Sequence, residues 1–140
     1  MSMTKGTMAT LLVLLLLLTG IPAALAGGDQ ARPFDQDLNG HIVGMGDPGG
    51  CTEGALWRTS MAGTGTVTHM GRVTWEASHC FHPGGTFSDS TITITAANGD
   101  QLFGEYTGSM TGATTWMEID SFLGGTGRFE NATGLAHGTG

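Results

Sequence analysis

The sequence predicts an all-β protein, an antiparallel β-barrel of about seven or eight strands. Glycine occurs 25 times among 140 residues, and each glycine inside a helix costs about 1 kcal/mol relative to alanine. Short runs alternate apolar residues with threonine, which is the period of two that strands show. Glycine-rich turns separate these runs at regular spacing. Closing such a sheet into a barrel would remove its exposed edges.

The first 26 residues have the three parts of a secretory signal peptide. Lys5 supplies a positive start, an apolar run follows at 11–18, and Ala24 and Ala26 fit the small-x-small cleavage pattern. The alternative is a membrane anchor, which needs roughly 20 apolar residues. This run is shorter, so the sequence predicts a secreted protein, extracellular or periplasmic, with no membrane span after cleavage.

Residues 27–39 are polar and are predicted to form a flexible N-terminal arm before a single barrel domain over 40–140. Within the domain the turn sequences "DPGG" and "HPGG" occur at 47–50 and 82–85. The predicted strands lie at 41–45, 54–61, 66–77, 90–97, 101–108 and 114–120, and a last strand begins at Leu135.

Two stretches of this pattern are the most informative. The run 66–77 alternates without a break, so it predicts one long strand. Asn98 and Gly99 stand between two strand-like runs, and this pair predicts a hairpin with a two-residue turn. Residues 122–134 form a glycine-rich corner, with one helical turn expected over 127–131.

The chain is acidic and has two cysteines. There are 12 Asp and Glu against five Lys and Arg, for a net charge of −7. Nucleic acid is therefore not expected as a partner, because phosphate binding needs a basic surface. In an exported protein Cys51 and Cys80 are predicted to form a disulfide. The alternative, a reactive thiol, needs a free and activated cysteine.

The corner sequence resembles a known family. "GGTGRFENATG" at 124–134 resembles the GGTG-K/R-F-x-x-A-x-G corner of the dirigent and allene oxide cyclase superfamily. "THMGR" at 68–72 and "AANGDQLFGEYTG" at 96–108 resemble segments of its small exported bacterial relatives. The resemblance implies an eight-stranded barrel with an apolar interior. Members usually continue for one or two strands past the corner, so it also implies a barrel incomplete at the C-terminus.

The resemblance further implies roles for the corner residues. Gly124, Gly125 and Gly127 would make the tight corner, Phe129 would close the barrel bottom, and Arg128 would lie in solvent or pair with an acid. The active-site residues of the cyclase do not align with this chain. We therefore assign no catalytic residue. As an enzyme, the chain would be a cyclase-like isomerase or a dirigent-type guide of coupling reactions.

A ligand site is predicted from strand parity. Val67, His69, Val73 and Trp75 share one face of the run 66–77, with His69 as the polar contact. Phe103 and Glu105 share a parity on the next-but-one run and complete this site. The alternative places His69 at the barrel rim with its polar tip in water.

Other acidic side chains could also face inward. Glu118 shares a parity with Trp116, and Asp120 follows on the same run. Burial would raise the pKa of such a carboxyl. A charged residue on a strand more often faces water, so the outward placement is favoured for each of these acids and the inward placement is the alternative.

The histidines do not predict a metal site. His79 and His82 form an HxxH pair, but on a strand they point to opposite sides. Zinc usually takes three or four ligands, and no third is evident. The sequence predicts no metal and no cofactor.

The favoured function is a secreted, non-catalytic binder of a small apolar molecule. Alternatives are a structural or surface-interaction barrel without a ligand, and the isomerase or dirigent-type protein. An interior filled tightly by aromatic side chains would favour the structural alternative. Oligomers are compatible with each function.

Overall fold

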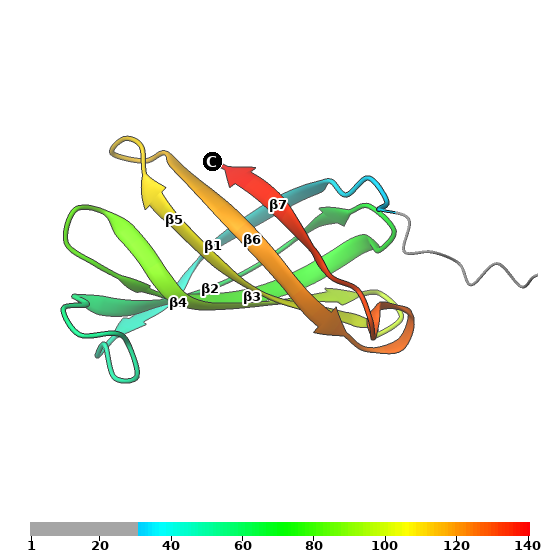
Figure 1. The fold of residues 1–140 in the computed structure, drawn as a ribbon, viewed down its shortest axis with the longest axis horizontal. Coiled ribbons are helices and arrows are strands. Elements are labelled where there is room, and N and C mark those ends of the chain that lie inside the picture. The colour runs from blue at the N-terminus through cyan, green and yellow to red at the C-terminus, as the bar shows by residue number, and fades with distance from the viewer. Residues whose placement is uncertain (1–30) are drawn as a thin grey trace, which may run out of the picture. The chain divides into compact units, whose positions relative to one another are not determined.

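The computed structural model describes residues 31–140; the predicted signal peptide and the first residues of the predicted arm lie outside them. Seven antiparallel strands form one sheet in chain order (Figure 1). The strands are β1 (Gln36–Gly46), β2 (Trp57–Val67), β3 (Gly71–Phe81), β4 (Thr86–Ala96), β5 (Gln101–Met110), β6 (Trp116–Gly125) and β7 (Gly134–Thr139). A single 3-10 turn, η1 (Gly127–Phe129), follows β6. The all-β prediction is therefore confirmed.

Closure into a barrel is not confirmed. In residues 31–140, β1 and β7 stand at the two ends of the strand order and do not pair with each other. The sheet nevertheless curls, so that the start of β1 reaches β6. Gln36 Nε2 donates a hydrogen bond of 2.6 Å to Asp120 Oδ2, and the Phe34 and Phe122 rings lie 4.9 Å apart. We call the concave side of this curl the inner face.

The hydrophobic core covers one half of the inner face. Strand register brings Trp75, Ile94 and Leu102 into line across β3, β4 and β5. The buried cluster comprises Val67, Met70, Val73, Ala77, Phe87, Ile92, Ile94, Ala96, Leu102, Tyr106 and Phe122. Most of these residues lie toward the β2–β3 and β4–β5 turns, which we call the packed end. The opposite end carries the disulfide, and we call it the disulfide end.

The predicted strand 66–77 is wrong, because a turn divides it. β2 ends at Val67 and β3 begins at Gly71. His69 has a φ of 67°, and Met70 N donates to Val67 O at 3.0 Å. Val67 and Gly71 pair across the turn, so they face the same side of the sheet. A three-residue connection keeps the alternation in phase, which is why the sequence pattern shows no break.

The hairpin at 96–100 is present, but its turn differs by one residue. Gly99 N donates to Ala96 O at 2.9 Å, and Ala96 N donates to Asp100 O at 2.8 Å. Gly99 has a φ of 90°. This is a three-residue loop, a turn followed by a left-handed residue. The predicted two-residue turn with a central Asn98-Gly99 pair is therefore wrong.

The first strand is longer than predicted. β1 begins at Gln36, inside the predicted arm, and pairs with β2 from Gln36↔Val67 onward. This edge strand is largely exposed, including its apolar residues Ile42, Val43 and Met45. The last strand, β7, and the helical turn expected over 127–131 are confirmed.

The glycine corner at 124–127 is tightly packed. A Cβ on Gly125 would overlap the carbonyl oxygen of Gln101, and Gly127 has a φ of 56°. Arg128 pairs with Asp100 at 3.6 Å, and Phe129 packs against the core.

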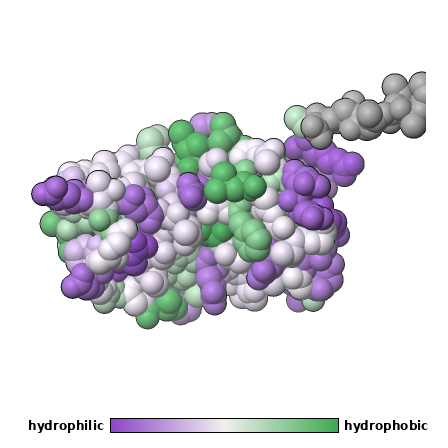
Figure 2. All heavy atoms as spheres, turned by 60° about the horizontal axis from the view of Figure 1, so that its bottom comes forward, coloured by the Kyte–Doolittle hydropathy of each residue, from purple (hydrophilic) through white to green (hydrophobic). Residues whose placement is uncertain are grey.

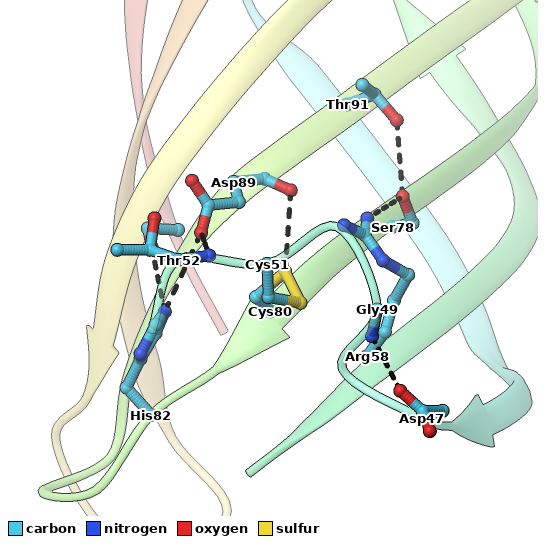
Figure 3. The surroundings of a disulfide bond; sticks show 11 residues. Asp47, Gly49, Cys51, Thr52, Arg58, Ser78, Cys80, His82, Asp89 and Thr91 are labelled. Atoms are coloured by element: carbon cyan, nitrogen blue, oxygen red, sulfur yellow. Dashed lines mark hydrogen bonds and ion pairs between the residues drawn. A yellow bond between two sulfur atoms is a disulfide. The ribbon is translucent and has the colours of Figure 1, made fainter. Parts of the chain in front are cut away.

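The disulfide between Cys51 and Cys80 is formed, with Cα atoms 5.8 Å apart (Figure 3). It holds the β1–β2 loop against β3. Thr52 N also donates to Asp89 Oδ2 at 2.8 Å, so the loop is tied to β4 as well. Among the described residues, no helix has the length and apolarity needed to cross a membrane.

Candidate functional site

Polar side chains gather on the inner face toward the disulfide end. The set, which we call the inner polar site, consists of His79 from β3, Ser90 from β4, Tyr106 from β5, and Glu118 and Asp120 from β6. Tyr106 pairs with Asp120 in register, which places these two side chains on the same face. Except for Glu118, which is half-buried, all of these residues are buried.

His79 and Tyr106 form the centre of the site. His79 Nδ1 lies 2.9 Å from Tyr106 Oη. Burial, together with the nearby Arg58, lowers the pKa of His79 to about 4, so the imidazole is neutral at pH 7. Burial is also the main reason that the pKa of Tyr106 is raised. Ser90 Oγ is hydrogen-bonded to both backbone polar groups of Tyr106, which fixes that segment of β5.

The two acids of β6 lie beside this pair. Asp120 is 1% exposed. Its Oδ2 accepts from Gln36, whereas its Oδ1 has no hydrogen-bond partner among the described residues. Burial raises the pKa of Asp120 despite the Gln36 hydrogen bond. Burial and the Asp120 charge raise the pKa of Glu118 to about 7.

Small residues flank Glu118 on both neighbouring strands. It pairs with Gly108 of β5 and Gly138 of β7. A Cβ on Gly138 would overlap the Glu118 side chain, so the glycine makes room for this side chain to lie over β7. Asp120 likewise pairs with Ala136. The β7 side of the inner polar site is therefore lined by small residues next to an unpaired strand edge.

β6 reverses the usual distribution of polar and apolar residues. Glu118, Asp120 and Phe122 face inward, whereas Met117, Ile119 and Leu123 are 53%, 47% and 58% exposed. Figure 2 shows that hydrophobic residues gather in patches on the surface of the molecule. An arrangement with two carboxyls turned inward and apolar residues turned outward lowers the stability of the folded state.

Three of the predicted ligand-binding residues lie on the inner face, at the packed end. Val67 and Val73 are buried in the core cluster, and Trp75 packs against it. The Trp75 ring lies over Gly40, where a Cβ would overlap it. These side chains fill the packed end, so their contact with a ligand stays a prediction.

The other three do not face the interior. His69 is in the β2–β3 turn, exposed, with Nε2 3.1 Å from Pro33 O. Phe103 is 37% exposed and Glu105 is exposed, because the inward parity of β5 belongs to Leu102 and Tyr106. Their predicted places in an interior pocket are wrong. The turn moves His69 off the strand, and β5 has the opposite parity.

Sequence reasoning missed His79, Ser90 and Tyr106 as site residues. The neighbour of His79, Cys80, faces the other side of β3 and forms the disulfide. His82 points away from the site and lies 3.0 Å from Ser88 Oγ. In residues 31–140, no group of three or more His, Cys, Asp or Glu side chains is arranged to hold a metal ion.

Comparisons with protein-family models, with characterised proteins and with solved structures give no match for this chain. The geometry of the inner polar site is therefore the main evidence on function.

Proposed function

We propose that the protein is a secreted, non-catalytic binder of a small, mainly apolar molecule, held on the inner face at the disulfide end. The observation that carries the proposal is the reversed distribution of residues on β6. A strand that buries Asp120 and half-buries Glu118 while exposing Ile119 loses folding stability. A ligand that uses these inward polar groups accounts for such an arrangement.

The composition of the site supports an apolar ligand with a polar group. The rings of Phe87 and Tyr106 both pack against His79, with centroids 4.9 and 5.7 Å from the imidazole and 6.0 Å from each other. The rings of Trp57 and Phe81 stack with their centroids 4.9 Å apart, closer to the disulfide end. Aromatic walls with a few polar groups are typical of small-molecule sites.

Two further parts of the proposal come from the sequence. The signal-peptide pattern supports export, and the disulfide is compatible with an oxidising compartment. The glycine corner supports a relationship to the dirigent and allene oxide cyclase superfamily, because Gly125 and Gly127 occupy positions where a Cβ would clash. Neither point identifies a ligand.

The proposal is tested with a neutral fluorescent apolar probe, N-phenyl-1-naphthylamine, titrated into the purified protein. Ala136→Phe fills the β7 side of the site and should weaken probe binding at least tenfold. His137→Phe places the same ring on the exposed side of β7 and is the matched control. It should leave binding unchanged.

Absence of probe binding to the wild-type protein would contradict the proposal and favour a structural barrel. Equal weakening by both variants would show that the probe binds elsewhere.

A further inference from the structure

The polar atoms at the inner polar site that lack a hydrogen-bond partner among the described residues are acceptors. Asp120 Oδ1 and Gln36 Oε1 are buried and have no partner among residues 31–140. They belong to neighbouring side chains, since Gln36 Nε2 bonds the other oxygen of Asp120. Glu118 adds a half-buried carboxyl on the same strand face. A ligand that satisfies these groups must bring donors.

No positively charged side chain among residues 31–140 pairs with Asp120 or Glu118. Arg32, Arg72 and Arg128 are exposed, and Arg128 pairs with Asp100. Arg58 faces outward in register with Cys80, and it lies 3.4 Å from Ser78 Oγ. The two carboxyls therefore share the inner face without a positive partner.

Aromatic rings stand beside the acids on the same face. The β4–β5–β6 register aligns Phe87, Gly108 and Glu118. A Cβ on Gly108 would overlap the Phe87 ring, so this ring lies over β5 toward β6. Ring faces and carboxylates together are the surroundings in which proteins hold organic cations.

We propose that the inner polar site binds an organic ammonium group carried on an apolar body, with the nitrogen donating to Asp120 Oδ1, Gln36 Oε1 and Glu118. This inference rests on the proposed function and names the ligand class for the same site. Apolar amines, rather than alcohols or carboxylic acids, are the preferred ligands, because only an ammonium supplies both the missing charge and several donors.

The titratable groups around Glu118 determine how binding depends on pH. Asp120 faces it from β6, Tyr106 from β5 and His79 from β3, whereas β7 contributes Ala136 and Gly138 and β1 contributes Gln36. None of these supplies a positive charge at pH 7, since the pKa of His79 is about 4. A bound ammonium lowers the pKa of Glu118 from about 7, so binding at pH 7 releases part of a proton.

The test is isothermal titration calorimetry with three matched probes: 3-phenylpropylamine, 3-phenylpropanol and 3-phenylpropanoate. At pH 7 we expect the amine to bind about tenfold or more tightly than the alcohol, and the carboxylate to bind most weakly. Titration of the amine in phosphate and in Tris, which differ in ionisation enthalpy, should reveal the released proton.

Two variants distinguish binding of the amine at the inner polar site from its general attraction to an acidic protein. Glu118→Gln should reduce the amine-over-alcohol ratio severalfold and abolish proton release. Glu105→Gln removes the same charge from the exposed face of β5 and should leave both unchanged. Circular dichroism establishes that each variant is folded.

The outcomes distinguish the two proposals. An alcohol that binds as tightly as the amine overturns the ammonium inference, while binding to an apolar body stands. Equal effects of Glu118→Gln and Glu105→Gln also overturn it. If neither these probes nor N-phenyl-1-naphthylamine binds, the proposed function itself fails.

Discussion

Replacing Glu118 with glutamine should stabilise the protein above pH 7 and change its stability little below about pH 4.5. The pKa of Glu118 is raised in the folded protein to about 7, from an ordinary value of 4.5. Between these values the folded state holds a proton that the unfolded chain has lost. The contribution of Glu118 to stability is therefore greatest below pH 4.5 and is lost as pH rises through 7.

The size of the effect follows from the width of that interval. At 1.36 kcal/mol for each pH unit, the interval corresponds to about 3.4 kcal/mol. Glu118 is half-buried, and solvent screening reduces this figure to about 2 kcal/mol. Glutamine removes the ionisation while keeping the shape of the side chain, so the variant should gain about that amount at pH 8.

Urea unfolding, followed by tryptophan fluorescence without reductant, measures this difference at several pH values between 4 and 8. His79 acts in the opposite direction, since its pKa falls to about 4 and its stabilising effect is lost as pH falls from 6.5 to 4. The difference between variant and wild type isolates Glu118 from His79. Glu105→Gln is the control, and a pH-independent difference for Glu118→Gln would refute the reasoning.

Three further predictions concern stability. Cys80→Ser should lower the unfolding free energy by about 2–5 kcal/mol in the oxidised protein, and thiol labelling of denatured, unreduced wild type should find no thiol from Cys51 or Cys80. Gly99→Val should destabilise by about 1–3 kcal/mol in thermal melts because φ is 90° there; a neutral result would contradict the turn geometry. Tyr106→Phe should cost about 1–3 kcal/mol in urea unfolding by leaving His79 Nδ1 without its partner, and an unchanged midpoint would show that this hydrogen bond contributes nothing.

Strand positions could be predicted from the sequence because turn residues and alternation are local signals. The turn at 68–70 could not, because three residues keep Val67 and Gly71 on one face and leave the alternation unbroken. The placement of His69 in a pocket failed with it. Local patterns fix the period of a strand, and the register between strands is required to locate such turns.

The parity of β5 could have been found from the sequence. Leu102, Gly104 and Tyr106 share one parity, whereas Glu105 and Thr107 share the other, and the charge favours the latter as the outer face. The prediction instead followed the apolar Phe103, which is 37% exposed. One aromatic residue outweighed the charge beside it.

The parity of β6 could not have been found by the same rule. Amphipathic patterning assigns Ile119 to the interior and Glu118 and Asp120 to water, and the structure has the opposite arrangement. Register decides it, because Tyr106 pairs with Asp120 and both strands must turn the same side inward. From the sequence, inward carboxyls are only the less usual alternative for each acid.

The fold tolerates the inner polar site because other parts of the molecule, the core, the glycine corner and the disulfide, stabilise it. The core and the glycine corner stabilise the packed end. The disulfide end has a polar inner face, and there the β1–β2 loop is bonded to the outer face of β3 at Cys80, directly after His79. A disulfide worth about 3 kcal/mol is comparable to the cost of one buried, unpaired carboxyl. We infer that the disulfide on the outer face of β3 offsets the unfavourable energy of the polar site on the inner face. Without these acids, the fold should depend less on the disulfide.

The variant that combines Glu118→Gln with Cys51→Ser and Cys80→Ser should therefore be folded at pH 8 under conditions where the cysteine double variant alone is partly unfolded. Equal unfolding of the two variants would refute this inference.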